Sequence, residues 1–174
     1  EIGEVITNNV RVFDNVPLQI GVSGTLVVRG EAVIKYSDFE AINAELEIEA
    51  KYKNPRNLCS GTVRQLNNEV TAKRHVNFFA FQLVSSDTIE VDSKLEQLTL
   101  LKQMGFEVVE TKEVRASTML EAVDYFAKAI ENNDFASDGL VLTFDSISYS
   151  ERLGSTSKFP KHSIAFKWKD EIKP

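Results

Sequence analysis

The alternation of apolar and polar positions along the chain predicts a mixture of strands and helices. Apolar and β-branched residues fill positions 25–34, a pattern typical of a strand, although Arg29, Gly30 and Glu31 interrupt it. Further strand-like runs occupy residues 76–84, 106–109, 139–144 and 164–168. Because regularly spaced crossover helices do not separate these runs, the pattern favours an α+β fold with largely antiparallel sheets over a doubly wound parallel sheet.

Three further segments carry the signature of a helix start. In each, Ser or Thr is followed three positions later by Glu, a capping box that satisfies free backbone N–H groups; the pairs are Ser37 with Glu40, Ser93 with Glu96, and Thr118 with Glu121. Apolar residues then recur at helical spacing, as Phe39, Ile42 and Leu46, as Leu95, Leu98 and Leu101, and as Leu120, Val123, Phe126 and Ile130. Gly105 is placed to end the second helix.

The composition excludes several classes of protein. Hydrophobic residues make up 43% and charged residues 26% of the 174 residues, which is typical of a globular protein. No run approaches the roughly 20 apolar residues of a membrane helix, so we expect no membrane contact. Lys and Arg number 20 against 26 Asp and Glu, which excludes a basic clamp along a nucleic-acid backbone. Any such contact must come from a local patch or from other parts of a larger protein.

The chain has no repeat, no low-complexity tract and no linker rich in Pro or Gly, which predicts a single domain over residues 1–174. It opens without Met and stops abruptly at Pro174, so we expect a piece of a longer protein. The single cysteine, Cys59, excludes an internal disulfide and a four-cysteine zinc site, and it fits a cytoplasmic protein.

Glu31 is a carboxylate within an apolar strand. Burying a carboxylate costs several kcal/mol unless the group is paired or hydrogen-bonded. One interpretation is a salt bridge between Glu31 and an arginine at a strand end. The other is a carboxylate directed at ribose hydroxyls or a metal, with Gly30 letting a ligand approach the backbone. The segment alone leaves both open.

Residues 54–66 place Arg56 and Arg64 among Asn, Ser, Gly and Thr. Arginine side chains match phosphate geometry, and small polar neighbours leave backbone N–H groups free for the same anion. The alternative is a capped loop followed by a helix, with both arginines merely solvated.

Three other segments suggest chemistry. Phe79 and Phe81 lie on one face of a predicted strand, where such rings are usually core but can also stack on a base. Lys167 lies inside an apolar strand, where a lysine either extends to solvent or meets an anion such as phosphate. Asp138, followed by Gly139, is by itself only a turn signal.

These segments occur in a fixed order along the chain. They read Arg-Gly-Glu at 29–31, Asn-Pro-Arg-Asn through Arg-Gln-Leu at 54–66, Phe-Phe-Ala-Phe at 78–81, Asp-Gly-Leu-Val at 138–141 and Ile-Ala-Phe-Lys-Trp at 164–168. The order resembles the adenylation domain of bacterial NAD-dependent DNA ligases. The resemblance extends from Glu4 to Trp168, and its most specific parts are residues 54–66 and 153–167.

The resemblance implies a nucleotidyltransferase fold that binds NAD and Mg²⁺. In that family a motif lysine attacks the adenylyl phosphorus of NAD, releases nicotinamide mononucleotide and carries AMP. The AMP then passes to the 5′-phosphate of a DNA nick, and the 3′-hydroxyl seals the nick. The implied partners are NAD or AMP, the rest of the ligase chain, and nicked duplex DNA bound by the full-length protein.

Carried over by residue, the resemblance implies a set of site residues. Glu31 holds the adenosine ribose, and Phe81 stacks on adenine where the family commonly has Tyr. Lys167 contacts the adenylyl phosphate as the lysine of the fifth motif. The remaining catalytic residues are Asp138, the fourth-motif acid near the metal, and two arginines of nick sealing, Arg56 and Arg64. A phosphorus transition state spreads negative charge that such cations stabilise.

The chain also departs from the family pattern. No Lys-x-Asp-Gly motif occurs, so we expect the nucleophile and the nicotinamide-binding subdomain to lie outside these residues and the isolated chain to be unable to adenylylate itself. The fourth motif ends in Thr143 where the family has a second lysine, and Asn132-Asn133 replaces an expected arginine. Either activity is reduced, or charge comes from elsewhere, such as Lys158 or Lys161. Two alternatives stay open: a non-catalytic nucleotide-binding paralogue and a plain α+β interaction domain.

Overall fold

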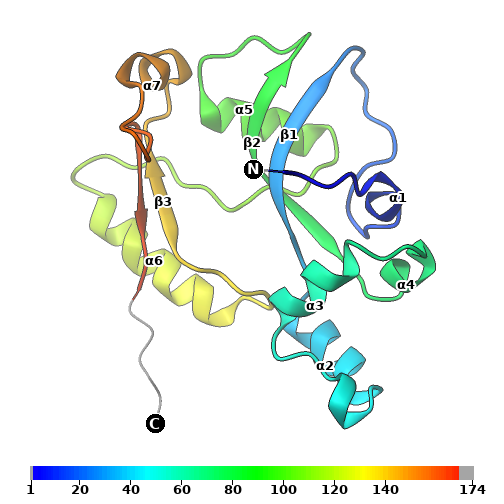
Figure 1. Cartoon of the computed structure of the whole chain (residues 1–174). Helices are drawn as coiled ribbons and strands as arrows, with labels where there is room; N and C mark the ends of the chain where they lie inside the picture. Colours follow the sequence, from blue (N-terminus) through cyan, green and yellow to red (C-terminus); the bar gives the residue numbers. More distant parts are fainter. Residues whose placement is uncertain (1, 169–174) are drawn as a thin grey trace. The chain divides into compact units, whose positions relative to one another are not determined.

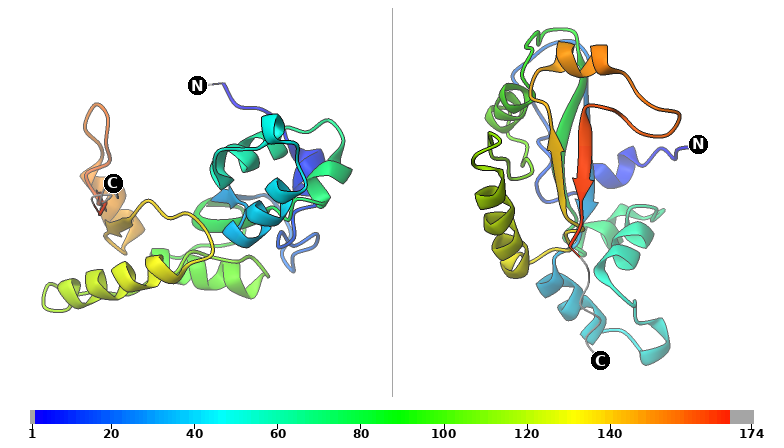
Figure 2. Two further views of the ribbon diagram at one scale, coloured as in Figure 1. Left: turned by 90° about the horizontal axis from the view of Figure 1, so that it is seen from below. Right: turned by 90° about the vertical axis from the view of Figure 1, so that its left-hand side faces the viewer.

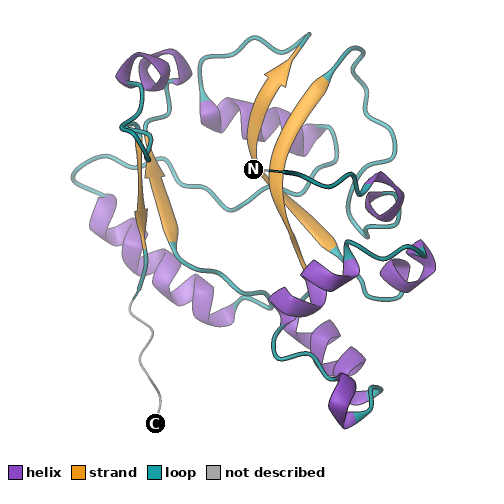
Figure 3. Cartoon of the chain, in the orientation of Figure 1, coloured by secondary structure: helices purple, strands orange, loops and turns teal. Residues whose placement is uncertain are grey.

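The computed structural model describes residues 2–168, which fold as short helices and antiparallel strand pairs (Figures 1 and 3). The helices are α1 (Thr7–Val10), α2 (Tyr36–Ala44), the 3-10 helix η1 (Ile48–Ala50), α3 (Pro55–Thr62), α4 (Asn68–Ala72), α5 (Lys94–Gln103), α6 (Met119–Asn132) and α7 (Ile147–Leu153). The strands are β1 (Leu26–Val33), β2 (Asn77–Ser86), β3 (Leu140–Thr143) and β4 (Ser163–Phe166). The α+β class with antiparallel sheets is confirmed.

The chain forms two compact units, each with its own two-stranded sheet. Unit 1 comprises the described residues of Glu1–Ile89, Leu98–Val109 and Asp134–Ala136. Unit 2 comprises those of Glu90–Gln97, Glu110–Asn133 and Ser137–Pro174. The single domain over residues 1–174 stays a prediction.

In unit 1, β2 is two residues longer than its partner β1. The eight residues of β1 pair antiparallel with β2, from Leu26 opposite Ser86 to Val33 opposite Asn77. The ten residues of β2 accommodate the difference in two register shifts. These shifts leave Phe81 and Val84 without a partner on β1, which makes each of them a β-bulge residue.

The core of unit 1 consists of two apolar clusters. The first joins β1 and the start of β2 to α3, and its buried residues are Phe13, Ile34, Leu58, Cys59 and Val76. The second joins β2 to α5 and consists of Ala80, Leu83, Leu98 and Leu101. Burial of Leu98 and Leu101 confirms the apolar face predicted for this helix.

A buried polar network fixes the short helices of unit 1. The Asn9 side-chain amide donates to the carbonyl oxygens of Val63 (2.8 Å) and Gln65 (2.9 Å), and its oxygen accepts from Thr71 Oγ1 (2.8 Å). Thr71 also donates to the Thr62 carbonyl oxygen at 3.0 Å. Because every polar atom of the buried Asn9 side chain has a partner, the network ties α1, α3 and α4 together without an unsatisfied group.

Unit 2 is built on the β3–β4 pair, seen edge to edge in the right-hand view of Figure 2. The pairing runs from Leu140 opposite Phe166 to Thr143 opposite Ser163. Helix α7 follows β3, and the Asp92 carboxylate accepts from the Ser148 N–H (2.6 Å) at its first turn. The hydrogen bonds from Ser148 and Ser146 lower the pKa of Asp92.

Two predicted capping boxes do not form. Helix α2 starts at Tyr36, and the Ser37 hydroxyl donates to the Asp134 carboxylate at 2.5 Å instead of capping its own helix. Helix α6 starts as expected, but the Thr118 hydroxyl bonds to Arg115. Ser93 does accept from the Glu96 N–H at 3.0 Å, so the second box is confirmed on the serine side.

The predicted strand at residues 106–109 is wrong. This segment forms a single parallel bridge between Val108 and Ala80, with the Ala80 N–H donating to the Glu107 carbonyl oxygen at 2.8 Å. The run is apolar because it packs on the second core cluster, in which Phe106, Val108 and Val109 are partly buried.

Within residues 2–168, no helix combines the length and the apolar character needed to cross a membrane.

Candidate functional site

The β1–β2 sheet displays Glu31 on its exposed face. Glu31 lies opposite Phe79 on β2. The Phe79 ring stacks on Phe135, with 4.9 Å between ring centroids. Of the two phenylalanines predicted on this face, Phe79 is therefore covered by another ring, whereas the Phe81 side chain is 43% exposed.

The bulge explains why the Phe81 ring is exposed. Gln82 pairs with Arg29 and Ala80 pairs with Gly30, so Phe81 is the extra residue between them. Bulges redirect a side chain and are common beside binding sites. The exposed ring is free to stack on a planar ligand, as the family resemblance implies for adenine.

Gly30 does not open the backbone to a ligand. A Cβ built at Gly30 would lie 2.4 Å from Cζ of Phe78 and 2.3 Å from the Phe79 carbonyl oxygen. The space over Gly30 is thus filled by the protein itself, and the interpretation of this glycine as an opening for a ligand is wrong. Its role is to let the Phe78 ring pack.

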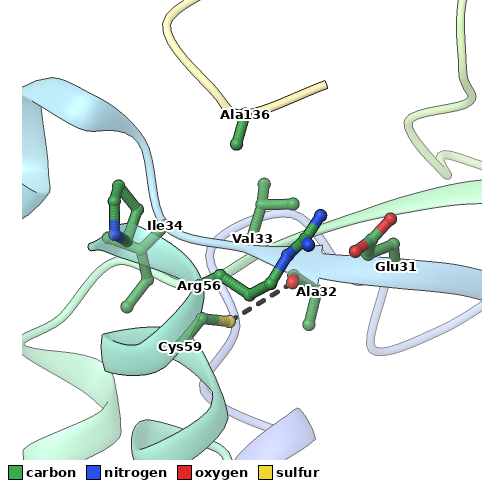
Figure 4. Close-up of a pocket in the computed structure, with 8 residues that line it drawn as sticks. Glu31, Ala32, Val33, Ile34, Arg56, Cys59 and Ala136 are labelled. Carbon is green, nitrogen blue, oxygen red and sulfur yellow. Dashed lines mark hydrogen bonds between the residues drawn. The ribbon is translucent and has the colours of Figure 1, made fainter. Parts of the chain in front are cut away.

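Helix α3 brings Arg56 next to Glu31. The Asn54 side chain caps the helix by accepting from the Asn57 N–H at 2.8 Å, and Pro55 occupies the first turn. Arg56 and Glu31 line one pocket together with Cys59 and Ala136, and Figure 4 shows the Arg56 side chain extending towards the Glu31 carboxylate.

The pocket that these residues line is small. Its volume is about 20 Å³, room for about one water molecule and far less than a pocket that encloses a nucleoside. The arrangement therefore fixes a carboxylate and a guanidinium on the surface of unit 1 rather than enclosing a ligand.

Cys59 also lines this pocket, and its thiol is unreactive. Its Sγ lies 3.3 Å from the Ala32 carbonyl oxygen, to which the thiol donates (Figure 4). Burial, and secondly the nearby Glu31 charge, raise the pKa of the Cys59 thiol to about 11. Because the thiolate is the nucleophile, this cysteine is not a candidate for covalent chemistry.

Arg64 lies beyond the far end of α3, about 12 Å along the helix axis from Arg56. It does not line the Glu31 pocket. Its guanidinium is exposed and pairs with the Glu4 carboxylate at 3.2 Å. The two predicted arginines thus face different surroundings.

In unit 2, the sheet register brings Asp138 and Lys167 to the same end of the strand pair. Gly139 follows Asp138, and a Cβ on Gly139 would lie 2.2 Å from the Phe166 carbonyl oxygen and 3.1 Å from Lys167 Cα. Gly139 has a φ of 150°. Only glycine permits this close approach, so the Asp-Gly pair sets Asp138 beside Lys167.

A lysine that the sequence did not indicate lies at the other end of β3. The Nζ of Lys94 donates to Thr143 Oγ1 at 2.7 Å. The sequence left open reduced activity or charge from elsewhere, with Lys158 and Lys161 as candidate sources, and the ammonium that contacts Thr143 belongs to Lys94. The contact brings together residues 49 positions apart, and no local pattern predicts it.

The described residues include no group of three or more His, Cys, Asp or Glu side chains able to hold a metal. Asp138 is therefore the one predicted metal ligand in this part of the chain, and it adds a single carboxylate.

Comparison with known proteins places these features in a family. A family profile described as "NAD-dependent DNA ligase adenylation domain" matches residues 1–171. The chain is 60% identical to the DNA ligases of Ruminiclostridium cellulolyticum and Lachnoclostridium phytofermentans, each over 175 residues, and 36% identical to the DNA ligase of Brachyspira hyodysenteriae over 176 residues. Each alignment covers 99% of the chain but 26–27% of the relative. The chain thus spans about a quarter of the length of these relatives. The comparisons do not favour a plain interaction domain or a non-catalytic paralogue.

Proposed function

The chain belongs to the family of NAD-dependent DNA ligase adenylation domains, and from this premise we propose that it is part of an enzyme that adenylylates one of its own lysines with NAD and then seals nicks in duplex DNA. The partners in this proposal are NAD or AMP, nicked DNA and the rest of the ligase chain. Because no Lys-x-Asp-Gly motif occurs in the 174 residues, the attacking lysine belongs to another part of the protein. Such chemistry, together with the single buried thiol, fits the cytoplasm of a bacterium.

For the adenosine part of the nucleotide, we assign Glu31 and Phe81. Glu31 lies on the exposed face of β1 and accepts from the ribose hydroxyls in this assignment. Phe81 supports a stacking role because its bulge position leaves the ring 43% exposed while Phe79 is covered by Phe135. Stacking of an aromatic ring on a base contributes about 1–3 kcal/mol.

For the phosphate, we assign Lys167, with Asp138 beside it. The observation that carries this assignment is the approach of Gly139 to Phe166 and Lys167, which holds the two motif ends together. The lysine stabilises negative charge that develops on the adenylyl phosphorus. Mg²⁺ supplies further charge neutralisation when bound, and a lone carboxylate fits an ion that keeps several waters and takes its other ligands from phosphates.

The two arginines have separate roles in this proposal. Arg56 lines a pocket with Glu31, and in this proposal it contacts a phosphate close to the nucleotide. Arg64 is on the surface in an exposed pair with Glu4, an interaction that contributes little and that a DNA phosphate can replace.

The test is formation of the covalent enzyme–AMP adduct by the full-length protein. Incubation with NAD and Mg²⁺ should add the mass of one AMP, and nicked duplex DNA should then be sealed. Lys167→Ala should slow adduct formation at least ~10²-fold because the transition-state charge loses a preorganised partner. Lys128→Ala, an exposed lysine on α6, is the matched control and should behave as wild type. A folded full-length protein that gains no AMP would refute the proposal.

A further inference from the structure

Lys94 is a half-buried cation that makes no ion pair within the described residues. It is the first residue of α5, and its Nζ donates to Thr143 Oγ1 at 2.7 Å. Thr143 Oγ1 in turn donates to the His162 carbonyl oxygen at 3.2 Å, which orients the hydroxyl lone pairs towards the ammonium. Among residues 2–168, no carboxylate lies within 4.0 Å of Lys94 Nζ.

Within the described residues, the Lys94 ammonium has fewer protein acceptors than donors. A lysine ammonium has three donors, and Thr143 accepts from one of them. The described residues provide no acceptor for the other two. Burial lowers the pKa of Lys94, although the charge of Asp145 acts in the opposite direction. A partly desolvated cation with unused donors is stabilised by a nearby anion, because the anion replaces the hydration that burial removes.

The register of the β3–β4 pair places Lys94 on the same sheet face as Lys167. Thr143 accepts from the Lys94 ammonium and lies on the same face of the sheet as Val141. Their partners on β4, Ser163 opposite Thr143 and Ala165 opposite Val141, lie on that face as well. Lys167 directly follows β4, two positions after Ala165, and strand alternation assigns it to that face.

This face is open between the two lysines. Val141 is 70% exposed, and its partner Ala165 is exposed and has only a methyl side chain. Thr143 and Gly139, which is beside Lys167, are four residues apart, or about 13 Å along an extended strand. Two long side chains that extend from opposite ends of such a face can both reach one anionic group lying over it.

We propose that Lys94 is a phosphate-binding residue that acts together with Lys167 on an anionic group of the nucleotide, with Thr143 holding its ammonium in place. This inference rests on the proposed function, because it takes Lys167 as the contact to the adenylyl phosphate. In this arrangement Thr143 itself is neutral, and the positive charge at the end of β3 comes from Lys94 at the start of α5.

The experiment compares AMP with adenosine in the nucleotide-free full-length protein, with affinities measured by calorimetry. Adenosine lacks the phosphate, so it reports on the rest of the site. Lys94→Met keeps the aliphatic stem and removes the charge. The double variant Lys94→Met/Thr143→Lys moves the ammonium to the other side of the 2.7 Å contact. Lys102→Met changes an exposed lysine of the same helix and is the control.

We expect Lys94→Met to weaken AMP binding about tenfold or more, the effect of removing a hydrogen bond to a charged group, and to leave adenosine binding unchanged. The double variant should recover AMP binding, and Lys102→Met should bind both ligands as wild type does. The inference is overturned if Lys94→Met binds AMP normally, if it loses both ligands equally, or if a folded double variant does not recover. A wild-type protein that binds neither ligand would instead count against the proposed function.

Discussion

The ring of Phe78 lies across Gly30, on the core side of the β1–β2 sheet. A Cβ at position 30 would lie 2.4 Å from the Phe78 ring and 2.3 Å from a backbone oxygen, distances that real Cβ atoms essentially never show. We therefore expect Gly30→Ala to destabilise the protein by about 1–3 kcal/mol through overpacking, measured as a lower free energy of unfolding in urea.

Gly21→Ala is the matched control for this prediction. No atom lies within 4 Å of the Cβ position at Gly21, so the added methyl group meets nothing. If the Gly30 variant were as stable as the Gly21 variant, the packing role of this glycine would be wrong.

Asn9 carries a second prediction about stability. Replacing it by Ala removes three hydrogen bonds and leaves the carbonyl oxygens of Val63 and Gln65 without their donor. Because unsatisfied buried groups are costly, we expect a loss of about 2–3 kcal/mol in the free energy of unfolding. Asn8→Ala, at the exposed neighbouring position, should cost much less. Equal losses would show that the buried network is not what stabilises α1.

Phe81 gives a prediction about nucleotide use. In the full-length protein, Phe81→Ala should raise the NAD concentration needed for half-maximal adenylylation, by the equivalent of about 1–3 kcal/mol of lost stacking. Phe81→Tyr should be nearly neutral because it keeps the aromatic ring. Unchanged NAD use by a folded Phe81→Ala protein would mean that this exposed ring does not contact the base.

The raised pKa of the Cys59 thiol predicts that the free energy of unfolding falls at alkaline pH. Burial raises the pKa of its thiol from 9.0 to about 11, so the folded protein holds this proton more tightly than the unfolded chain does. The stabilisation is fully present below about pH 9 and is lost as the pH rises to about 11. Urea unfolding across this range should therefore show a falling free energy of unfolding.

Cys59→Ala separates this effect from the titration of lysines and tyrosines. The variant loses packing at every pH, but its free energy of unfolding should fall less steeply between pH 9 and 11. Parallel pH profiles for the two proteins would contradict the assignment of the effect to the thiol.

The isolated 174-residue chain should form no AMP adduct with NAD and Mg²⁺. Covalent transfer needs a lysine held in line with the phosphorus, and such positioning supplies roughly 7–11 kcal/mol of the barrier. The lysines Lys35, Lys51, Lys158 and Lys161 all lie outside a Lys-x-Asp-Gly motif. Intact mass spectrometry is the measurement, and one AMP on any single lysine of this chain would contradict the expectation.

Sequence patterns predicted those helices and strands that arise from the order of apolar and polar residues within one segment. The apolar alternation of β1 and β2 and the helical spacing of Leu98 and Leu101 reflect burial on one face, which a sequence displays directly. Glu31 and Lys167 stood out as candidate site residues because each is a charged residue in an apolar run. Such departures are visible without a structure.

What the sequence did not reveal depends on contacts between distant segments. Ser37 looked like the cap of its own helix, but its hydroxyl bonds to Asp134, 97 positions away. Lys94 looked like an ordinary residue of a first helical turn until the fold brought it to Thr143. The extra residues of β2 relative to β1 could not be predicted from the sequence either, because register depends on how two strands pair.

The bulge at Phe81 has a consequence for how such a sheet can evolve. Loss of the single codon for Phe81 would make Ala80 and Gln82 neighbours, and they already pair with Gly30 and Arg29. The pairing would then be regular at this point, while the bulge at Val84 would remain. The aromatic ring is thus an addition to a sheet that is complete without it, and lineages can acquire or discard it by one in-frame insertion or deletion while the scaffold stays intact.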